Sequence, residues 1–168
     1  MIALAALALG QDKPKDVDGW GKIKWGVTTF AQARAAYGIQ ENPVKDANGT
    51  TGLEFKKLEV GNIILHGWAY DTQGNGKITA LGLLMSYGLN DSLPSSSAED
   101  LNTLRTLLTQ KYGPPVSTER GMSDTIRVTT ILWTFPSTSI LLTLHEGNVA
   151  GHLTLEYKGT DKKALGVL

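Results

Sequence analysis

The side chains with the most chemical potential in this chain are two histidines close to its carboxyl end. His145 and His152 flank Gly147-Asn148, a dipeptide typical of the tight turn of a β-hairpin. On such a hairpin both imidazoles share one face as near-diagonal neighbours, about 5 to 8 Å apart, with Glu156 further along that face. Zinc accepts two imidazoles and one carboxylate as ligands. Exposed histidines beside threonines are the simpler explanation, so we predict no resident metal or cofactor.

A second segment, Asp71 to Ile78, resembles the opening of a calcium-binding loop. Oxygen-bearing side chains alternate before a glycine, as they do in such loops. However, Gln73 is neutral where a carboxylate is usual, and Gly82 occupies the twelfth position, where calcium needs a bidentate Glu. The tight turn that Gly74-Asn75-Gly76 favours accounts for the same residues, and we predict a turn.

No catalytic group stands out from the remaining residues. The chain has no cysteine, which excludes disulfides, thiolate nucleophiles and cysteine-ligated zinc, and it has no Gly-x-Ser-x-Gly pattern. Carboxylates on or near predicted strands leave hydrolysis by an acid pair open, but nothing selects a pair. They are Glu54, Glu59, Asp71, Glu146 and Glu156. We therefore predict no catalytic residue and a protein that is not an enzyme.

Tryptophan can anchor a partner, because it combines a large apolar area with one polar group. Trp68 and Trp133 lie within apolar segments, which predicts that both pack in the core. Trp20 lies among Gly, Asp and Lys residues, which favours partial exposure. We therefore take Trp20, together with His145, His152 and Glu156, as the candidate binding residues.

The best-marked element is a helix between Ser95 and Pro115. Ser96 or Ser97 can cap its first turn, and Glu99 completes a capping box with Ser96. Gly113 and the prolines that follow it end the helix. One stripe of the helix is apolar and must be buried; it consists of Leu101, Leu104, Leu108 and Tyr112.

A shorter amphipathic helix is predicted earlier in the chain. Thr29 and Gln32 have the spacing of a capping box, and Gly38 supplies the left-handed residue that ends many helices. Its apolar stripe consists of Phe30, Ala33 and Tyr37.

Three extended segments follow each helix, with a polar loop in between. The loops are residues 42–52 and 117–124. The last hairpin pairs Leu144 with Gly151 and Leu142 with Leu153 if its turn has two residues, which places one apolar and one polar face on the sheet. We also expect a β-bulge at Lys56-Lys57, where the apolar alternation loses phase. The segments are 53–60, 63–70, 78–87, 125–135, 139–145 and 149–158, and Trp20 to Trp25 predicts a further short strand.

These elements predict one α+β domain over residues 20–158. Its two amphipathic helices pack on one face of an antiparallel sheet of six or seven strands, because the helix stripes and the apolar side of the sheet need each other. Helix and meander occur twice, which predicts a tandem repeat with halves at about 20–90 and 91–158 and a tail at 159–168.

Composition and the amino-terminal residues limit the functions that the chain can have. Sixteen basic and sixteen acidic residues cancel among 168, so the charge expected of a nucleic-acid binder is missing. Residues 1–19 start with the apolar run MIALAALAL, which resembles a secretory signal and is too short to span a bilayer. A short terminal helix is the alternative. We expect a periplasmic or secreted protein without stable membrane insertion once this segment is removed.

The order of the elements carries a resemblance to known proteins. Each predicted helix ends in Tyr-Gly and leads through a loop into an antiparallel meander. This order resembles the small lipoproteins of the bacterial outer-membrane assembly machine and the secreted β-lactamase-inhibitor proteins. The anchoring cysteine of the lipoproteins is absent. The resemblance implies a protein-binding or scaffold role, with another protein as partner and the uncovered sheet face as the binding surface. The alternative is a metal-dependent or carboxylate-based hydrolase on the same face.

Overall fold

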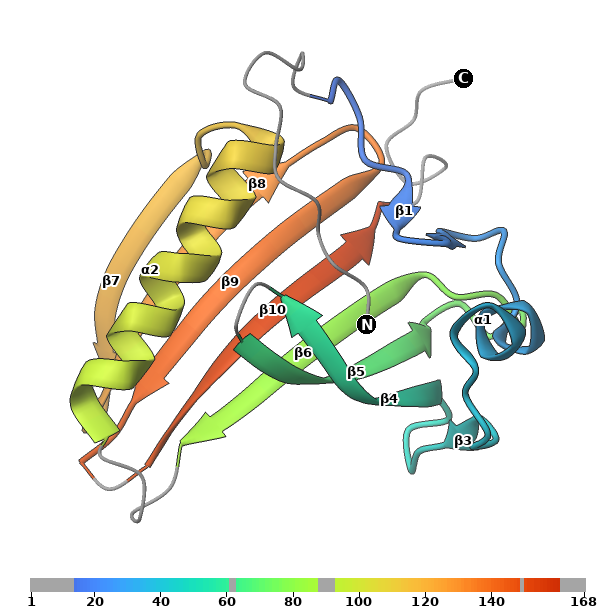
Figure 1. Ribbon diagram of the computed structural model, residues 1–168, viewed down its shortest axis with the longest axis horizontal. Coiled ribbons are helices and arrows are strands. Elements are labelled where there is room, and N and C mark those ends of the chain that lie inside the picture. Colours follow the sequence, from blue (N-terminus) through green and yellow to red (C-terminus); the bar gives the residue numbers. More distant parts are fainter. Residues whose placement is uncertain (1–13, 61–62, 88–92, 149, 161–168) are drawn as a thin grey trace.

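The computed structural model describes residues 14–60, 63–87, 93–148 and 150–160. Over these ranges the fold is α+β, with two helices, an antiparallel sheet of eight strands and a separate two-stranded hairpin (Figure 1). The elements are β1 (Gly19–Trp20), β2 (Ile23–Lys24), α1 (Phe30–Tyr37), β3 (Val44–Lys45), β4 (Thr51–Val60), β5 (Ile63–Asp71), β6 (Ala80–Tyr87), α2 (Leu93–Tyr112), β7 (Ser117–Ser123), β8 (Ile126–Thr134), β9 (Thr138–Glu146) and β10 (Gly151–Gly159). Residues 1–13 of the predicted signal-like segment and linker (1–19), and residues 161–168 of the predicted tail (159–168), lie outside the described residues.

The strand order in the large sheet is β3-β4-β5-β6-β10-β9-β8-β7. Each helix is followed by four strands that pair with their neighbours in the chain, and the last strands of the two sets, β6 and β10, pair with each other. The prediction of six or seven strands is therefore too low. It missed β3 and β7, which lie in the segments expected to be loops. Because the side chains of both edge strands are almost entirely exposed, no apolar alternation marks them.

Helix α2 packs against β9 and β10 and runs roughly along the strands (Figure 1). Its predicted stripe is buried, with Leu104 fully inaccessible. Hydrogen bonds help to fasten the helix to the sheet: the Tyr87 hydroxyl donates to the Asp100 carboxylate at 3.0 Å, and the Trp133 indole N–H donates to the Gly113 carbonyl at 2.9 Å. The face of the sheet that meets α2 carries the apolar core of the molecule.

The ends of the helices test the capping predictions. At α1 the capping box is confirmed, since the Gln32 N–H donates to Thr29 Oγ1 and the Thr29 N–H donates to Gln32 Oε1. Gly38 ends α1 with φ of 67°, as predicted. At α2 the predicted start is wrong, because the helix begins at Leu93 and Ser96 and Ser97 lie inside it. Pro94 suits the first turn, where a backbone N–H has no helical partner.

The β9–β10 hairpin has a different register from the predicted one. Leu144 pairs with Leu153 rather than with Gly151, and Leu142 pairs with Leu155. The turn is longer than two residues, since the Gly147 N–H donates to the Ala150 carbonyl at 2.9 Å. Because the register moves by two positions, every side chain stays on its predicted face, and all four leucines are buried. The bulge between Phe55 and Leu58 is confirmed.

Candidate binding face of the sheet

The side of the sheet opposite α2 is here called the open face. Strand β5 shows the division, since its burial alternates: residues 63, 65, 67, 69 and 71 are buried, whereas Ile64, His66 and Trp68 are exposed. Cross-strand pairing carries the same division through the central strands. The residues of the open face on these strands include Ile64, His66, Trp68, Tyr70, Gly82, Leu84, Leu141, Thr143, His145, His152, Thr154, Glu156 and Lys158.

The two histidines of the predicted hairpin lie directly opposite each other on the open face. His145 pairs with His152, and their rings stack at a centroid distance of 4.3 Å and an interplanar angle of 16°. The near-diagonal arrangement expected from the sequence is therefore wrong, because the longer turn moves the register. Burial, with a smaller effect of the charge on His145, holds the pKa of His152 below its usual value.

Glu156 shares the open face with the histidines but does not join them. It pairs with Gly82 on one side and Leu141 on the other, and its carboxylate lies 3.3 Å from the ammonium group of Lys158. Burial, followed by the charge of Glu156, raises the pKa of Tyr70. No group of three or more His, Cys, Asp or Glu side chains in the described part of the chain is arranged to hold a metal ion.

A hollow of about 390 Å³ opens at the centre of this face. Gly82 lies within it and pairs with Trp68 on one side and Glu156 on the other. Because Gly82 has no side chain, it leaves a gap in the layer of side chains between them. The walls include Trp68, Tyr70, Leu84, Thr154 and Glu156. A neighbouring hollow of about 420 Å³ reaches Ile64 and His66 and shares Trp68 and Leu84. Trp68 thus lines both hollows.

The prediction that Trp68 packs in the core is wrong. Trp68 is 38% exposed, whereas Trp133 is 1% exposed, as expected for a core tryptophan. Both faces of β5 carry apolar residues, so periodicity alone could not place Trp68. Its position relative to His66 could have placed it. Side chains two residues apart in a strand share a face, so Trp68 lies on the face of the polar His66 and Ala69 lies on the opposite face.

Trp20 lies on the other side of the sheet. Its ring stacks on Tyr37 of α1 at 5.8 Å and meets the edge of Phe55 at 6.4 Å, and Phe55 belongs to the buried core. Trp20 is partly buried, in keeping with the partial exposure that its sequence context favours. The structure therefore brings His145, His152 and Glu156 to one face and leaves Trp20 apart from them.

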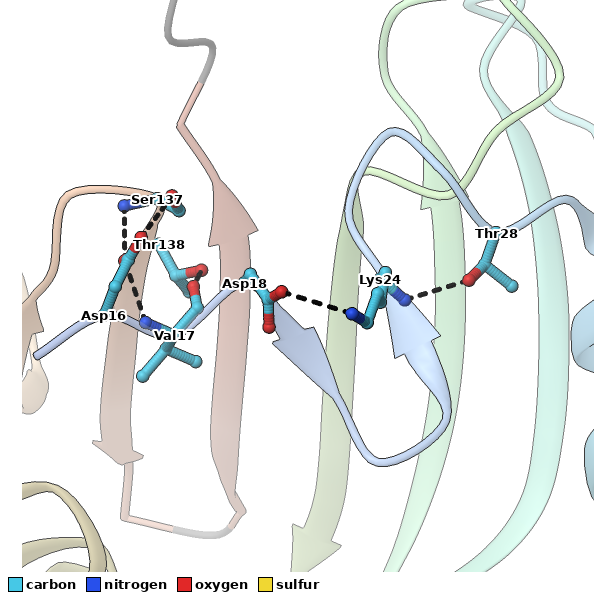
Figure 2. Close-up of polar contacts among 7 residues, drawn as sticks. All are labelled: Asp16, Val17, Asp18, Lys24, Thr28, Ser137 and Thr138. Atoms are coloured by element: carbon cyan, nitrogen blue, oxygen red, sulfur yellow. Dashed lines mark hydrogen bonds and ion pairs between the residues drawn. The ribbon is translucent and has the colours of Figure 1, made fainter. Parts of the chain in front are cut away.

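The segment before β1 is fixed to the turn between β8 and β9 (Figure 2). The Asp16 carboxylate accepts hydrogen bonds from the backbone N–H of Ser137 at 2.8 Å and from its hydroxyl at 2.6 Å. The Thr138 hydroxyl donates to the Val17 carbonyl and accepts from the Trp25 indole N–H. These polar groups satisfy one another across the end of the sheet, so the contacts explain how the β1–β2 hairpin is held in place.

The calcium-like segment is a turn whose carboxylate serves its own backbone. Asp71 accepts hydrogen bonds from the N–H groups of Gln73, Gly74 and Gly76 at 2.6–3.0 Å. Burial opposes ionisation of Asp71, but the backbone donors outweigh it and lower the pKa. The spacing of oxygen-bearing residues thus reflects a turn held by one aspartate.

Comparison with known proteins gives no relative for this chain. No protein-family model, curated protein or solved structure matches it. The resemblance to assembly lipoproteins and β-lactamase inhibitors therefore stays a prediction. Over the described ranges, neither helix has the length and apolar character needed to cross a membrane.

Proposed function

We propose that the chain is a non-enzymatic protein-binding module whose open face receives another protein. The observation that carries this proposal is Trp68, a 38% exposed tryptophan at the centre of a sheet and on the walls of two hollows. Interface hot spots are enriched in Trp and Tyr that occupy the middle of a contact surface. Tyr70 and Leu84 extend the apolar surface, and Ile64, 51% exposed, continues it.

The scaffold suits a rigid binding surface. The central strands β5, β6, β10 and β9 each have a paired neighbour on both sides, so their backbones hold the open-face side chains in a fixed arrangement. A preorganised surface loses less conformational entropy on binding than a mobile loop does. The rigid placement of Trp68 favours binding of a partner whose surface is complementary to it.

We further infer that the halves at about 20–90 and 91–158 derive from one duplicated helix-and-meander unit, with both helices on the same side of the sheet. Two features support this inference: each helix precedes four sequential strands, and the final strands of the two sets pair. The resemblance to assembly lipoproteins and β-lactamase inhibitors implies the same build. It also implies a binding role and, with the signal-like residues 1–9, export to the periplasm or medium.

The hydrolase alternative has less support. It would use His145, His152 and Glu156, but Glu156 lies against Lys158 and away from the histidine pair. The hollow beside Glu156 is lined mainly by apolar and small side chains, a composition that suits contact with a protein surface.

The test compares the wild-type chain with Trp68→Ala and Met122→Ala as bait in an extract of exported proteins from the source organism. Met122 is 66% exposed on β7 and pairs with Arg127, on the side of the sheet that meets α2, which makes it a matched control. We expect one partner to bind the wild type and the Met122 variant and to bind the Trp68 variant about thirtyfold more weakly, equivalent to about 2 kcal/mol. Equal affinity for all three chains would contradict the proposal.

A further inference from the structure

We propose that His145 and His152 form a two-ligand site for a divalent transition-metal ion, with Cu²⁺ preferred over Ni²⁺ and Zn²⁺. The proposal concerns the chain by itself and does not depend on the protein-binding role of the open face. Its basis is the direct pairing of the two histidines on neighbouring strands of one face.

The backbone fixes the two histidines relative to each other. His145 lies on β9 and His152 on β10, and both strands are inside the sheet, with β8 and β6 as their outer neighbours. The residues paired on either side of the couple are Val128 on β8 and Ser86 on β6. Because four hydrogen-bonded strands hold the backbone of the pair, binding an ion needs rotation of the two side chains but no movement of the strands.

The strand pairing brings both ligand side chains within reach of one ion, because the Cβ atoms of directly opposite residues lie about 4.5–5.5 Å apart. Zinc–nitrogen bonds are about 2.0–2.1 Å long, so two imidazole nitrogens on one tetrahedral ion lie about 3.3 Å apart. The rings stack at 4.3 Å between centroids, with an interplanar angle of 16°. Because a metal ion binds an imidazole nitrogen in the plane of the ring, the rings must rotate out of this stack before one nitrogen of each can reach a shared ion.

The ring nitrogens are available for binding. Among the residues that the structure describes, neither imidazole takes part in a hydrogen bond, and both side chains are half-buried. The same-face neighbours along the strands are Thr143 and Thr154, which are small and uncharged.

The ligand chemistry selects the metal class. Imidazole suits Cu²⁺, Ni²⁺ and Zn²⁺, and affinity within this series rises to Cu²⁺ and falls again at Zn²⁺. Calcium and magnesium prefer oxygen ligands, and the nearest carboxylate on β10, Glu156, is four residues from His152 and lies against Lys158. The remaining coordination positions of the ion would be taken by water.

The test is isothermal titration of the full, tag-free chain with CuCl₂, NiCl₂ and ZnCl₂ at neutral pH. We expect one ion per chain, tightest for Cu²⁺, and at least about a tenfold loss of affinity in His145→Ala and in His152→Ala. His66→Ala is the matched control, because His66 shares the open face but pairs with Leu84. Its affinity should equal that of the wild type.

A second readout separates binding from folding. The Cu²⁺ complex should show electron paramagnetic resonance couplings to two nitrogens, and acidification below the imidazole pKa should release the ion. The circular dichroism spectrum of each variant checks that the fold is intact. Absence of uptake by the wild type, or equal affinities of His145→Ala, His152→Ala and His66→Ala, would overturn the proposal.

Discussion

The two faces of the sheet share the same strands but use their side chains differently. On the side of α2, Leu65, Leu83 and Leu155 are at most 1% exposed. On the open face, His66 and Trp68 alternate along β5 with the buried residues 65, 67 and 69 and remain exposed. An apolar residue in a strand therefore does not by itself belong to the core, because Ile64 and Trp68 lie on the face that α2 does not cover.

The largest difference is expected between Leu104→Ala and Leu84→Ala. Leu104 is fully buried in the stripe of α2, so its truncation should lower the free energy of unfolding by about 2–5 kcal/mol through lost burial and a cavity. Leu84 lies half-buried on the open face. Its truncation should lower the free energy of unfolding by about 1 kcal/mol or less, because water already reaches the side chain. Chemical denaturation measures both. Similar costs at the two sites would remove the distinction between the faces.

Adding a methyl group at two glycines, one on each face, tests the same distinction by filling space instead of removing side-chain atoms. A Cβ atom at Gly67, on the covered face, would lie 2.6 Å from Leu58 Cδ1 and 3.0 Å from Leu83 Cδ2. Gly67→Ala should therefore destabilise the protein by about 1–3 kcal/mol through overpacking. At Gly82, on the open face, the nearest heavy atom would be Tyr70 Cε2 at 3.5 Å, an ordinary contact. Gly82→Ala should leave the denaturation midpoint nearly unchanged, and a large loss there would show that the hollow is closed.

Asp71 is a polar exception at the covered end of β5. Asp71→Ala removes the acceptor of three backbone N–H groups and should destabilise the fold by about 1–3 kcal/mol. Because its pKa is lowered on folding, its contribution is complete above the unfolded value of about 3.9 and is lost as the pH falls below it. Stability measured from pH 7 to pH 2 should therefore fall less steeply at the acidic end in the variant. An unchanged acid profile would contradict this role.

The smallest effect is expected at His152 on the open face. Its pKa is lowered on folding, so the unfolded chain binds more protons once the pH falls below the unfolded value of about 6.5. Stability should therefore decline from that pH downward and level off below the folded pKa. His152→Gln removes this component, and the difference between the two pH profiles measures it. Among the residues that surround the histidine pair on this face, His145 is the titratable neighbour of His152. The others carry no charge; they are Thr143, Thr154, Ser86 and Val128.

Local chemistry made several elements predictable from the sequence. The capping box of α1, the stripe of α2 and the bulge after Phe55 depend on residues a few positions apart, and each lies where the sequence predicts it. The same holds for the face of each leucine in the last hairpin, because side chains alternate whatever the register. The α+β class follows from these elements.

Other features needed the three-dimensional structure. The edge strand β7 has polar, exposed side chains, so only its hydrogen bonds to β8 identify it as a strand. The buried face of β5 is decided by its packing in the shared core, which puts Trp68 on the open side. The stacking of His145 on His152 depends on a turn that is longer than the sequence suggested. Sequence alone determined which residues alternate and where helices can stop, because those are local preferences. Tertiary structure decided which side is covered and which residues meet, because burial and strand register are set by distant parts of the chain.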